Sequence, residues 1–224
     1  MTFSITALCP RSGQFGVAIS SSSPAVAARC AHARAGVGAV ATQNITDPRL
    51  GTKALDLLGA GHGAEAALRH LVQSEPFIEY RQVAVVDASG GVALHSGART
   101  LGTYGTAQAS GVAAAGNLLA GDGVPGEMLA AFLGSEGSLA ERLLRGLEAG
   151  VAAGGEAGPV HSAGLLVVRD VSWPLVDLRV DWEDDGPIAR LRHLWTIYAP
   201  QADAYVTRAL NPASAPSYGV AGDP

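Results

Sequence analysis

The start of the chain alternates between apolar and hydroxylated side chains. Phe3, Ile5 and Ala7 are apolar, and they alternate with Thr2, Ser4 and Thr6. A period of two is typical of a β-strand with one face in the protein core and one face toward solvent. The chain is therefore predicted to begin inside a β-sheet, with one buried face on its first strand.

A second strand is predicted directly after a turn. Residues 10–13 contain proline, serine and glycine, which favour turns, and residues 15–19 are again mostly apolar. Two strands joined by such a short turn form an antiparallel hairpin. In this hairpin Thr2 is expected to lie near Ser20, so that the first hydroxyl of the chain meets a second cluster of hydroxyls.

Helical spacing of apolar residues recurs in five later stretches. Asp47 and Pro48 favour a helix start, and Ser138 with Glu141 forms a capping box. Each predicted helix has one apolar face that must be covered. The predicted helices span residues 48–58, 63–72, 126–133, 138–151 and 187–197.

Further strands fall between these helices. Residues 80–87 and 92–96 flank a Ser-Gly-Gly turn and predict a second hairpin, whereas residues 112–119 fit either a strand or a loop. Strands in hairpins with helix pairs between them do not fit an alternating βαβ pattern. They indicate an α+β fold in which antiparallel sheet is covered by helices. Additional strands are predicted at residues 37–43, 162–169 and 176–180.

No linker divides the chain, so a single domain is expected over residues 1–210. Residues 211–224 contain three prolines and no apolar periodicity, which predicts a loosely ordered tail. Residues 152–159 are rich in glycine and alanine and predict a mobile loop.

Composition narrows the functional classes. A net charge of −5 over 224 residues argues against nucleic acid as a partner. No apolar run reaches the length of a membrane-spanning helix and no signal peptide is visible, which predicts a cytoplasmic protein without membrane contact. Only 16% of residues are charged, so a homo-oligomer, dimer or higher, is expected. The two cysteines and six histidines lack ligand spacing, and neither a metal nor another cofactor is predicted.

Thr2 carries the candidate chemistry. Once Met1 is removed, the free α-amine of Thr2 can accept the proton of the neighbouring hydroxyl, which makes Thr2 a nucleophile with its own base. The alternative is that Thr2 only reflects the preference of threonine for strands.

Several stretches, in order along the chain, resemble one known family. The chain looks like the family of domain of unknown function 1028 (DUF1028), which is grouped with the N-terminal-nucleophile (Ntn) hydrolase-like superfamily. This resemblance implies an αββα sandwich, with two antiparallel sheets face to face and helices on both outer faces, and a nucleophile at the first residue of the first strand. The stretches that carry it are 2–5, 36–43, 55–58, 81–83, 116–121, 140–144 and 176–181.

The other candidate site residues each have an alternative reading. Asn117 is the candidate oxyanion donor, or an asparagine in a turn. Ser20, Ser21 and Gln43 are candidates to hydrogen-bond the amine or substrate, although serines at strand ends often bond only to backbone. As supporting residues, His95 would point into the sheet interface, and Asp177 would bind substrate or belong to a charge ladder with Arg179 on an edge strand.

The sequence departs from the threonine peptidases of this superfamily, which place an aspartate after the second strand and a lysine on the third. Here the corresponding positions offer serines and Gln43, and Lys53 is the sole lysine. The amine would then depend on burial and neutral hydrogen bonds. The leading hypothesis is an Ntn-type amidohydrolase acting on a small-molecule amide or cyclic amide. The alternative is a catalytically inactive Ntn-like protein that keeps Met1 and binds a ligand or partner.

Overall fold

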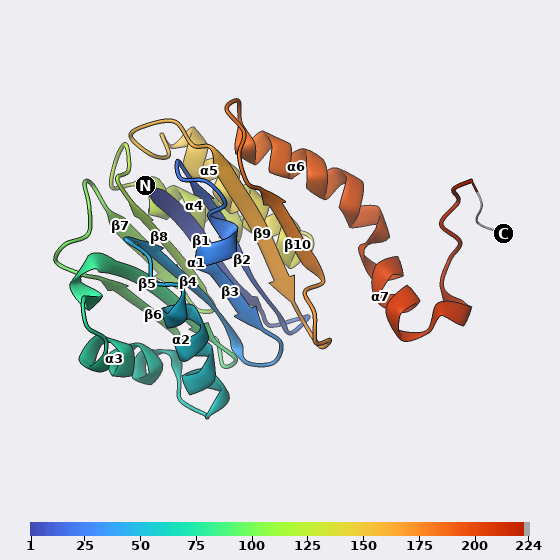
Figure 1. Ribbon diagram of the computed structural model, residues 1–224, viewed down its shortest axis with the longest axis horizontal. Coiled ribbons are helices and arrows are strands. Elements are labelled where there is room, and N and C mark those ends of the chain that lie inside the picture. Colours follow the sequence, from blue (N-terminus) through green and yellow to red (C-terminus); the bar gives the residue numbers. More distant parts are fainter. Residues whose placement is uncertain (222–224) are drawn as a thin grey trace.

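The structure is a computed structural model that describes residues 1–221, and two antiparallel sheets form its centre (Figure 1). Six strands lie in the order β10-β9-β2-β1-β8-β7, and four in the order β3-β4-β5-β6. The strands are β1 (Thr2–Cys9), β2 (Gln14–Ser21), β3 (Ala31–Arg34), β4 (Gly38–Asn44), β5 (Arg81–Asp87), β6 (Val92–Ser96), β7 (Gly105–Ala109), β8 (Val112–Asn117), β9 (Ser162–Val168) and β10 (Val176–Val180).

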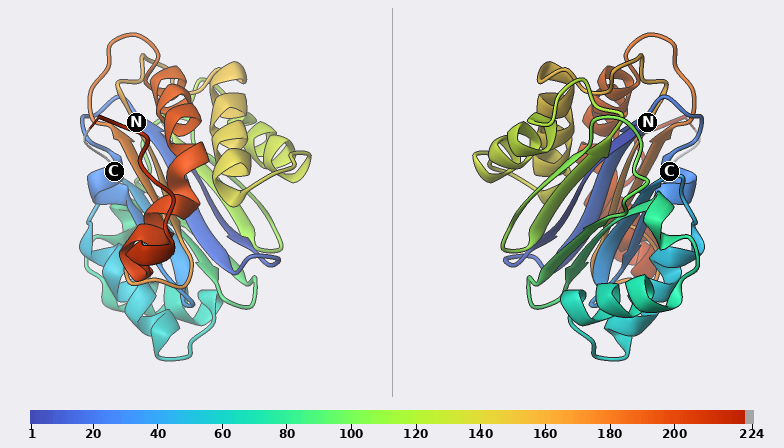
Figure 2. Two further views of the ribbon diagram at one scale, coloured as in Figure 1. Left: turned by 90° about the vertical axis from the view of Figure 1, so that its right-hand side faces the viewer. Right: turned by 90° about the vertical axis from the view of Figure 1, so that its left-hand side faces the viewer.

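Helices cover both outer faces of the stacked sheets, which gives four layers in the order helix, sheet, sheet, helix (Figure 2). The α-helices are α1 (Ala27–Cys30), α2 (Arg49–Gly59), α3 (Ala64–Ser74), α4 (Val124–Leu133), α5 (Leu139–Ala152), α6 (Pro187–Tyr198) and α7 (Ala202–Leu210). Three short 3₁₀ helices are η1 (Ile78–Tyr80), η2 (Ala199–Gln201) and η3 (Pro212–Ser214). The predicted αββα sandwich is confirmed.

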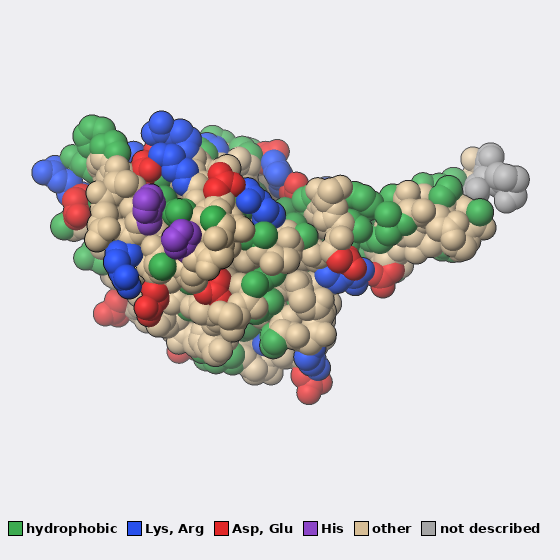
Figure 3. All heavy atoms as spheres, turned by 90° about the horizontal axis from the view of Figure 1, so that it is seen from below, with side chains coloured by type: hydrophobic (Ala, Val, Ile, Leu, Met, Phe, Trp, Pro, Cys, Tyr) green, Lys and Arg blue, Asp and Glu red, His purple; other side chains and the backbone are tan. Residues whose placement is uncertain are grey.

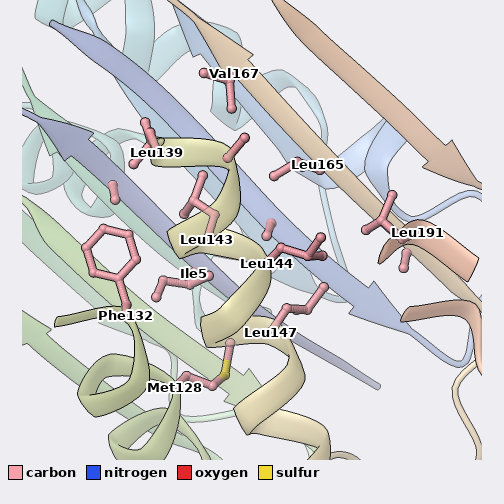
Figure 4. Close-up of a cluster of buried hydrophobic side chains, with 14 of the residues drawn as sticks. Ile5, Met128, Phe132, Leu139, Leu143, Leu144, Leu147, Leu165, Val167 and Leu191 are labelled. Atoms are coloured by element: carbon pink, nitrogen blue, oxygen red, sulfur yellow. The ribbon is translucent and has the colours of Figure 1, made fainter. Parts of the chain in front are cut away.

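The largest apolar cluster joins the six-stranded sheet to α4, α5 and α6 (Figure 4). Leu143 and Leu147 of α5 are fully buried against Ile5 of β1 and its neighbours. Close approach of this helix requires a glycine in β2, because a Cβ on Gly16 would lie 2.7 Å from a Leu143 methyl group. The packing of α5 therefore fixes the positions of β1 and β2 in the six-stranded sheet.

A separate cluster fills the space between the two sheets. Val17 and Ile19 of β2 face Ala39 of β4 and Val86 of β5, and small alanines complete the layer. The third cluster, from α2 and α3, covers the outer face of the four-stranded sheet. Each sheet is thus buried on both faces near its centre.

The expectation of one buried face on β1 is therefore wrong. Thr2, Ser4 and Thr6 are at most 4% exposed, as buried as their apolar neighbours. Their hydroxyls face the second sheet rather than solvent, because β1 is a central strand of an inner layer. A row of buried hydroxyls in this position needs polar partners from the opposite sheet.

Other departures from the sequence predictions have local causes. β7 escaped prediction because it holds glycine, threonine, alanine and glutamine, with no large apolar side chain to mark a period. β8 is a strand, not a loop. α2 begins at Arg49, and Pro48 occupies the N-cap position. Asp47 still accepts a hydrogen bond from the Arg49 amide at 3.1 Å. The Ser138 hydroxyl accepts from the Glu141 amide at 3.2 Å, as the capping box predicts.

The C-terminal segment after α6 projects from the body of the molecule (Figure 3). α7 has no buried residue, and residues 211–221 are mostly exposed around η3. The last three residues of the predicted tail lie outside the described residues. Within residues 1–221, no helix combines the length and apolar character needed to cross a membrane.

Candidate active site

Thr2 begins β1, between the two strands that hold the other hydroxyls and amides of the site. The register that pairs Phe3 with Ser20 brings Thr2 beside Ser21, and the two hydroxyl oxygens are 3.3 Å apart. On the other side of β1, Thr2 is paired with Asn117 of β8. Cross-strand partners present their side chains on the same face of a sheet. Thr2, Ser21 and Asn117 therefore share one end of the space between the sheets.

Met1 occupies the centre of this group. The hydroxyls of Thr2 and Ser21 both donate to the Met1 carbonyl oxygen. Ser21 is held in turn by Ser23, with 2.8 Å between their hydroxyl oxygens. While Met1 is attached, the nitrogen of Thr2 belongs to a peptide bond and cannot act as a base. Chemistry at Thr2 therefore requires removal of the preceding residue.

A chain of side-chain hydrogen bonds crosses from one sheet to the other beneath Thr2. The Ser4 hydroxyl donates to Gln43 Oε1 at 2.7 Å, and Gln43 Nε2 donates to Gln82 Oε1 at 2.7 Å. The same Gln82 oxygen accepts from Asn117 Nδ2 at 3.2 Å. All four side chains are at most 1% exposed. Gln43 is thus linked to Asn117 through Gln82, a residue that the sequence reasoning missed.

Asn117 lies at the end of a strand and not in a turn. Its Nδ2 directs one N–H at Gln82, which leaves a second N–H for another acceptor. Its Oδ1 is buried without a hydrogen-bond partner among the described residues. The next residue, Leu118, has a φ of +52°, a conformation that is uncommon for a residue with a side chain. The chain thus leaves β8 sharply, right beside Thr2.

Ser20 points to the opposite face of β2 from Ser21, because side chains alternate along a strand. Its hydroxyl donates to the Ser162 carbonyl of β9 at 2.9 Å. Ser20 thus makes the bond to backbone that is common for serines at strand ends. Ser20 therefore touches neither the Thr2 hydroxyl nor Met1 in this structure.

His95 and Asp177 lie away from Thr2. The expectation that His95 points into the sheet interface is wrong. Leu94 packs between the sheets, so the next residue, His95, lies on the outer face, and its Nε2 is 3.3 Å from the Ile78 carbonyl oxygen of η1. Asp177, on edge strand β10, accepts two hydrogen bonds from Arg179 at 2.7 and 2.9 Å. The charge-ladder reading describes the contact that Asp177 makes.

Glu156 is the buried carboxylate that the sequence reasoning missed. It lies in the stretch expected to be a mobile loop, yet it is 5% exposed and forms a bridge with Leu119. Both carboxylate oxygens lie 3.2 Å from the Ser22 amide nitrogen, which donates to them. Burial raises the pKa of Glu156 to about 7, although the nearby Met1 ammonium and the Ser22 amide lower it. The signal available in the sequence was a lone carboxylate among glycines and alanines.

This pKa predicts that Glu156 makes folding pH-dependent. Because the pKa is raised in the folded state, the contribution of Glu156 to stability is fully present below about pH 4.5 and is lost as pH rises through about 7. Between those limits the chain that keeps Met1 is expected to lose on the order of 3 kcal/mol relative to its Glu156→Gln variant. Urea unfolding of both proteins at pH 4.5 and pH 8 measures this. A stability difference that is the same at both pH values would contradict it.

The side chains that could bind a metal ion lie apart from one another. Across residues 1–221, no three histidine, cysteine, aspartate or glutamate side chains gather closely enough to hold a metal ion. Cys9 and Cys30 are both buried and unpaired with each other. The polar groups around Thr2 are therefore hydroxyls, side-chain amides and the carboxylate of Glu156.

Solved structures that are similar to this chain include a member of a named family. The crystal structure of protein SPO2555 from Silicibacter pomeroyi, labelled DUF1028, is 31% identical, with a TM-score of 0.83 over 88% of this chain and 86% of that chain. Anbu (ancestral beta-subunit) from Yersinia bercovieri is 9% identical with a TM-score of 0.39, covering 91% of this chain and 97% of that one. Anbu from Hyphomicrobium is 8% identical with a TM-score of 0.37, covering 98% and 100%. The two Anbu similarities are too weak to support an argument.

Comparison with families agrees with the similarity to SPO2555. No curated protein matches this chain. The model of the "Family of unknown function (DUF1028)" matches residues 2–191, from the first residue of β1 to the middle of α6. The matched region includes Thr2, Ser21, Gln43, Asn117 and Glu156. Because the match covers most of the sequence, the chain belongs to the DUF1028 family.

Proposed function

We propose that the protein is an Ntn-type amidohydrolase whose nucleophile is Thr2 after removal of Met1. The observation that carries this proposal is the position of the Met1 carbonyl oxygen, which accepts hydrogen bonds from both Thr2 and Ser21. Departure of Met1 leaves space for a carbonyl group within reach of two hydroxyls and frees the α-amine beside them. A nucleophile, a base and a donor would then lie together in a site that is 4% exposed at Thr2.

The proposed reaction transfers an acyl group to Thr2 and then to water. The Thr2 hydroxyl oxygen attacks the amide carbon while the α-amine takes the hydroxyl proton. The resulting oxyanion accepts hydrogen bonds from the free N–H of Asn117 and from Ser21. The protonated amine then gives its proton to the leaving nitrogen, and the C–N bond breaks. Water attacks the ester with the amine as base, which restores the Thr2 hydroxyl and releases the acid.

The size of the substrate follows from the surroundings of Thr2. The nucleophile is buried, and the space vacated by Met1 is flanked by Ser21 and by the segment around Gly158, where an added Cβ would lie 3.4 Å from the Met1 methyl carbon. This segment limits the room for a substrate chain on that side of Thr2. A small or cyclic amide is therefore the proposed substrate class.

The rival function is an inactive Ntn-like protein that keeps Met1 and binds a ligand or partner. One observation favours it, because the Met1 carbonyl satisfies the hydroxyls of Thr2 and Ser21. Intact mass spectrometry of the purified protein separates the two functions. We expect a mass that lacks methionine, whereas complete retention of Met1 would support the inactive protein.

A substrate screen tests the activity itself. A library of small amides and lactams is incubated with the Met1-free protein, and the release of acid and amine is followed by mass spectrometry. We expect hydrolysis of at least one cyclic or small linear amide, with a hydroxylamine-sensitive acyl group on the N-terminal peptide. Hydrolysis without any label on that peptide would contradict the role of Thr2.

The proposed setting of this reaction is the cytoplasm, and the proposed assembly is a homo-oligomer. Exposed apolar side chains on the C-terminal segment support an assembly, since Leu210 is 64% and Val220 63% exposed. Light scattering coupled to size exclusion tests it. A monomeric mass at micromolar concentration would contradict the oligomer.

A further inference from the structure

We infer that, once Thr2 is the first residue, Glu156 is the carboxylate that pairs with the Thr2 α-amine and holds it beside the Thr2 hydroxyl. Glu156 is thus a positioning residue for the nucleophile, and this assignment rests on the proposed function. It supplies the charged partner that the sequence lacks at the positions where threonine peptidases carry aspartate and lysine.

The backbone around Glu156 brings it to the start of β1. Asn117 is paired with Thr2, and the chain that follows it runs alongside residues 155–157. The Ala157 amide donates to the Leu118 carbonyl at 2.9 Å, and the Ala120 amide donates to the Gly155 carbonyl at 3.0 Å. Glu156 is therefore tied, through residues 118–120, to the strand that lies next to Thr2.

The side chain of Glu156 approaches from the β2 side. Its two oxygens share the Ser22 amide, which directly follows the Ser21 hydroxyl that touches Thr2 and Met1. The hydrogen bonds that the structure gives this carboxylate come from one residue, the Ser22 amide and the Ser22 side chain. Its two oxygens can accept about four hydrogen bonds, so a buried carboxylate held by one residue can accept further donors. An ammonium group supplies the missing donors.

The amino terminus is already close to Glu156 in the chain that keeps Met1. The positive charge of the Met1 ammonium acts on Glu156 and opposes the larger effect of burial on its pKa. Removing Met1 shortens the chain by one residue and moves the ammonium to Thr2, inside the same group of side chains. The positive charge that acts on Glu156 therefore moves from the Met1 amine to the Thr2 amine.

The other charged groups near this end of the sheet have their own partners. Arg29 donates to Ser23 and to the Pro24 carbonyl. His161, whose amide donates to the Ser21 carbonyl, has its Nδ1 3.4 Å from an Asp184 oxygen and stacks on Trp182. The Thr2 amine is thus left to Glu156.

The test measures the amine directly and needs no substrate. A fusion protein is cleaved so that Thr2 is the first residue, and pulse acetylation across pH 5 to 10 gives the pKa of the α-amine from the labelled N-terminal peptide. Glu156→Gln is expected to lower that pKa by about one unit or more, a tenfold change in the ratio of neutral to charged amine. Asp177→Asn, which removes an exposed carboxylate on β10, is expected to leave it unchanged.

An amine pKa that is the same in Glu156→Gln and wild type would overturn the assignment, as would an equal shift in Asp177→Asn. Should Glu156→Gln fail to fold, carbon-13 NMR titration of the Glu156 carboxyl in the wild type replaces it. Acetylation of the α-amine is expected to raise the carboxyl pKa, and no change would overturn the pairing. Loss of the proposed catalysis in a Thr2 variant affects neither measurement, so the two proposals can fail separately.

Discussion

Replacement of Thr2 by alanine is expected to lower kcat of the amidohydrolase by about 10⁴-fold or more while KM changes little. Removing the nucleophile of an acyl-transfer site leaves only the rate provided by binding and oxyanion stabilisation. The substitution removes one hydroxyl and one methyl group at the start of β1. The backbone pairings of β1, residue 2 with Asn117 and Phe3 with Ser20, do not depend on the Thr2 side chain. Initial rates on the hydrolysed amide, with circular dichroism to check folding, measure the effect.

The matched control is Thr6→Ala. Thr6 is the same residue type on the same face of the same strand, fully buried, and its hydroxyl has no hydrogen-bond partner among the described residues. Its loss is expected to change kcat less than threefold. Undiminished turnover in Thr2→Ala would rule out Thr2 as the nucleophile. An equal loss of kcat in Thr6→Ala would show that the loss in Thr2→Ala comes from damage to the strand.

The second large effect is on stability. Leu143→Ala is expected to lower the free energy of unfolding by about 3 to 4 kcal/mol, because it opens a cavity where α5 packs on the six-stranded sheet. Leu143 is fully buried, and its methyl group occupies the space that Gly16 leaves open. Urea denaturation followed by circular dichroism measures the change.

Leu133→Ala is the control for this prediction. Leu133 ends α4 and is 53% exposed, so the same truncation is expected to cost less than about 1 kcal/mol. Equal destabilisation by the two variants would contradict the layered core described above. Because α5 also supports β1, Leu143→Ala is expected to reduce the yield of active enzyme before it changes the kinetics of the folded fraction.

Periodicity was sufficient to predict an antiparallel sheet covered by helices, because apolar faces on helices and on hairpin strands must be covered. The order of the four layers was implied by the resemblance to the family. The prediction failed where side-chain size carried no pattern, as in β7. It also failed on the surroundings of β1, since alternation distinguishes two faces but does not show whether the polar face meets water or another sheet.

The site required information that no local pattern contains. The hairpin, which is local in sequence, predicted that Thr2 lies near Ser20, and the register of the two strands places Thr2 beside the next residue, Ser21. The link from Gln43 through Gln82 to Asn117 depends on the register of strands far apart in the chain. Glu156 lies in a stretch whose composition is typical of loops, and its burial follows only from the folded path of residues 118–120.

Because β1 and its neighbour β8 are far apart in the sequence, β1 is synthesised well before its partner. Thr2 is paired with Asn117, and Glu156 is made later still. At a translation rate of about 5 to 20 residues per second, the partners on β8 emerge roughly 6 to 20 seconds after the amino terminus. An aminopeptidase has that interval to reach Met1 before β8 and Glu156 fold against the start of β1. Slower translation would favour the processed chain, whereas a denatured chain that still carries Met1 would refold with the methionine in the site.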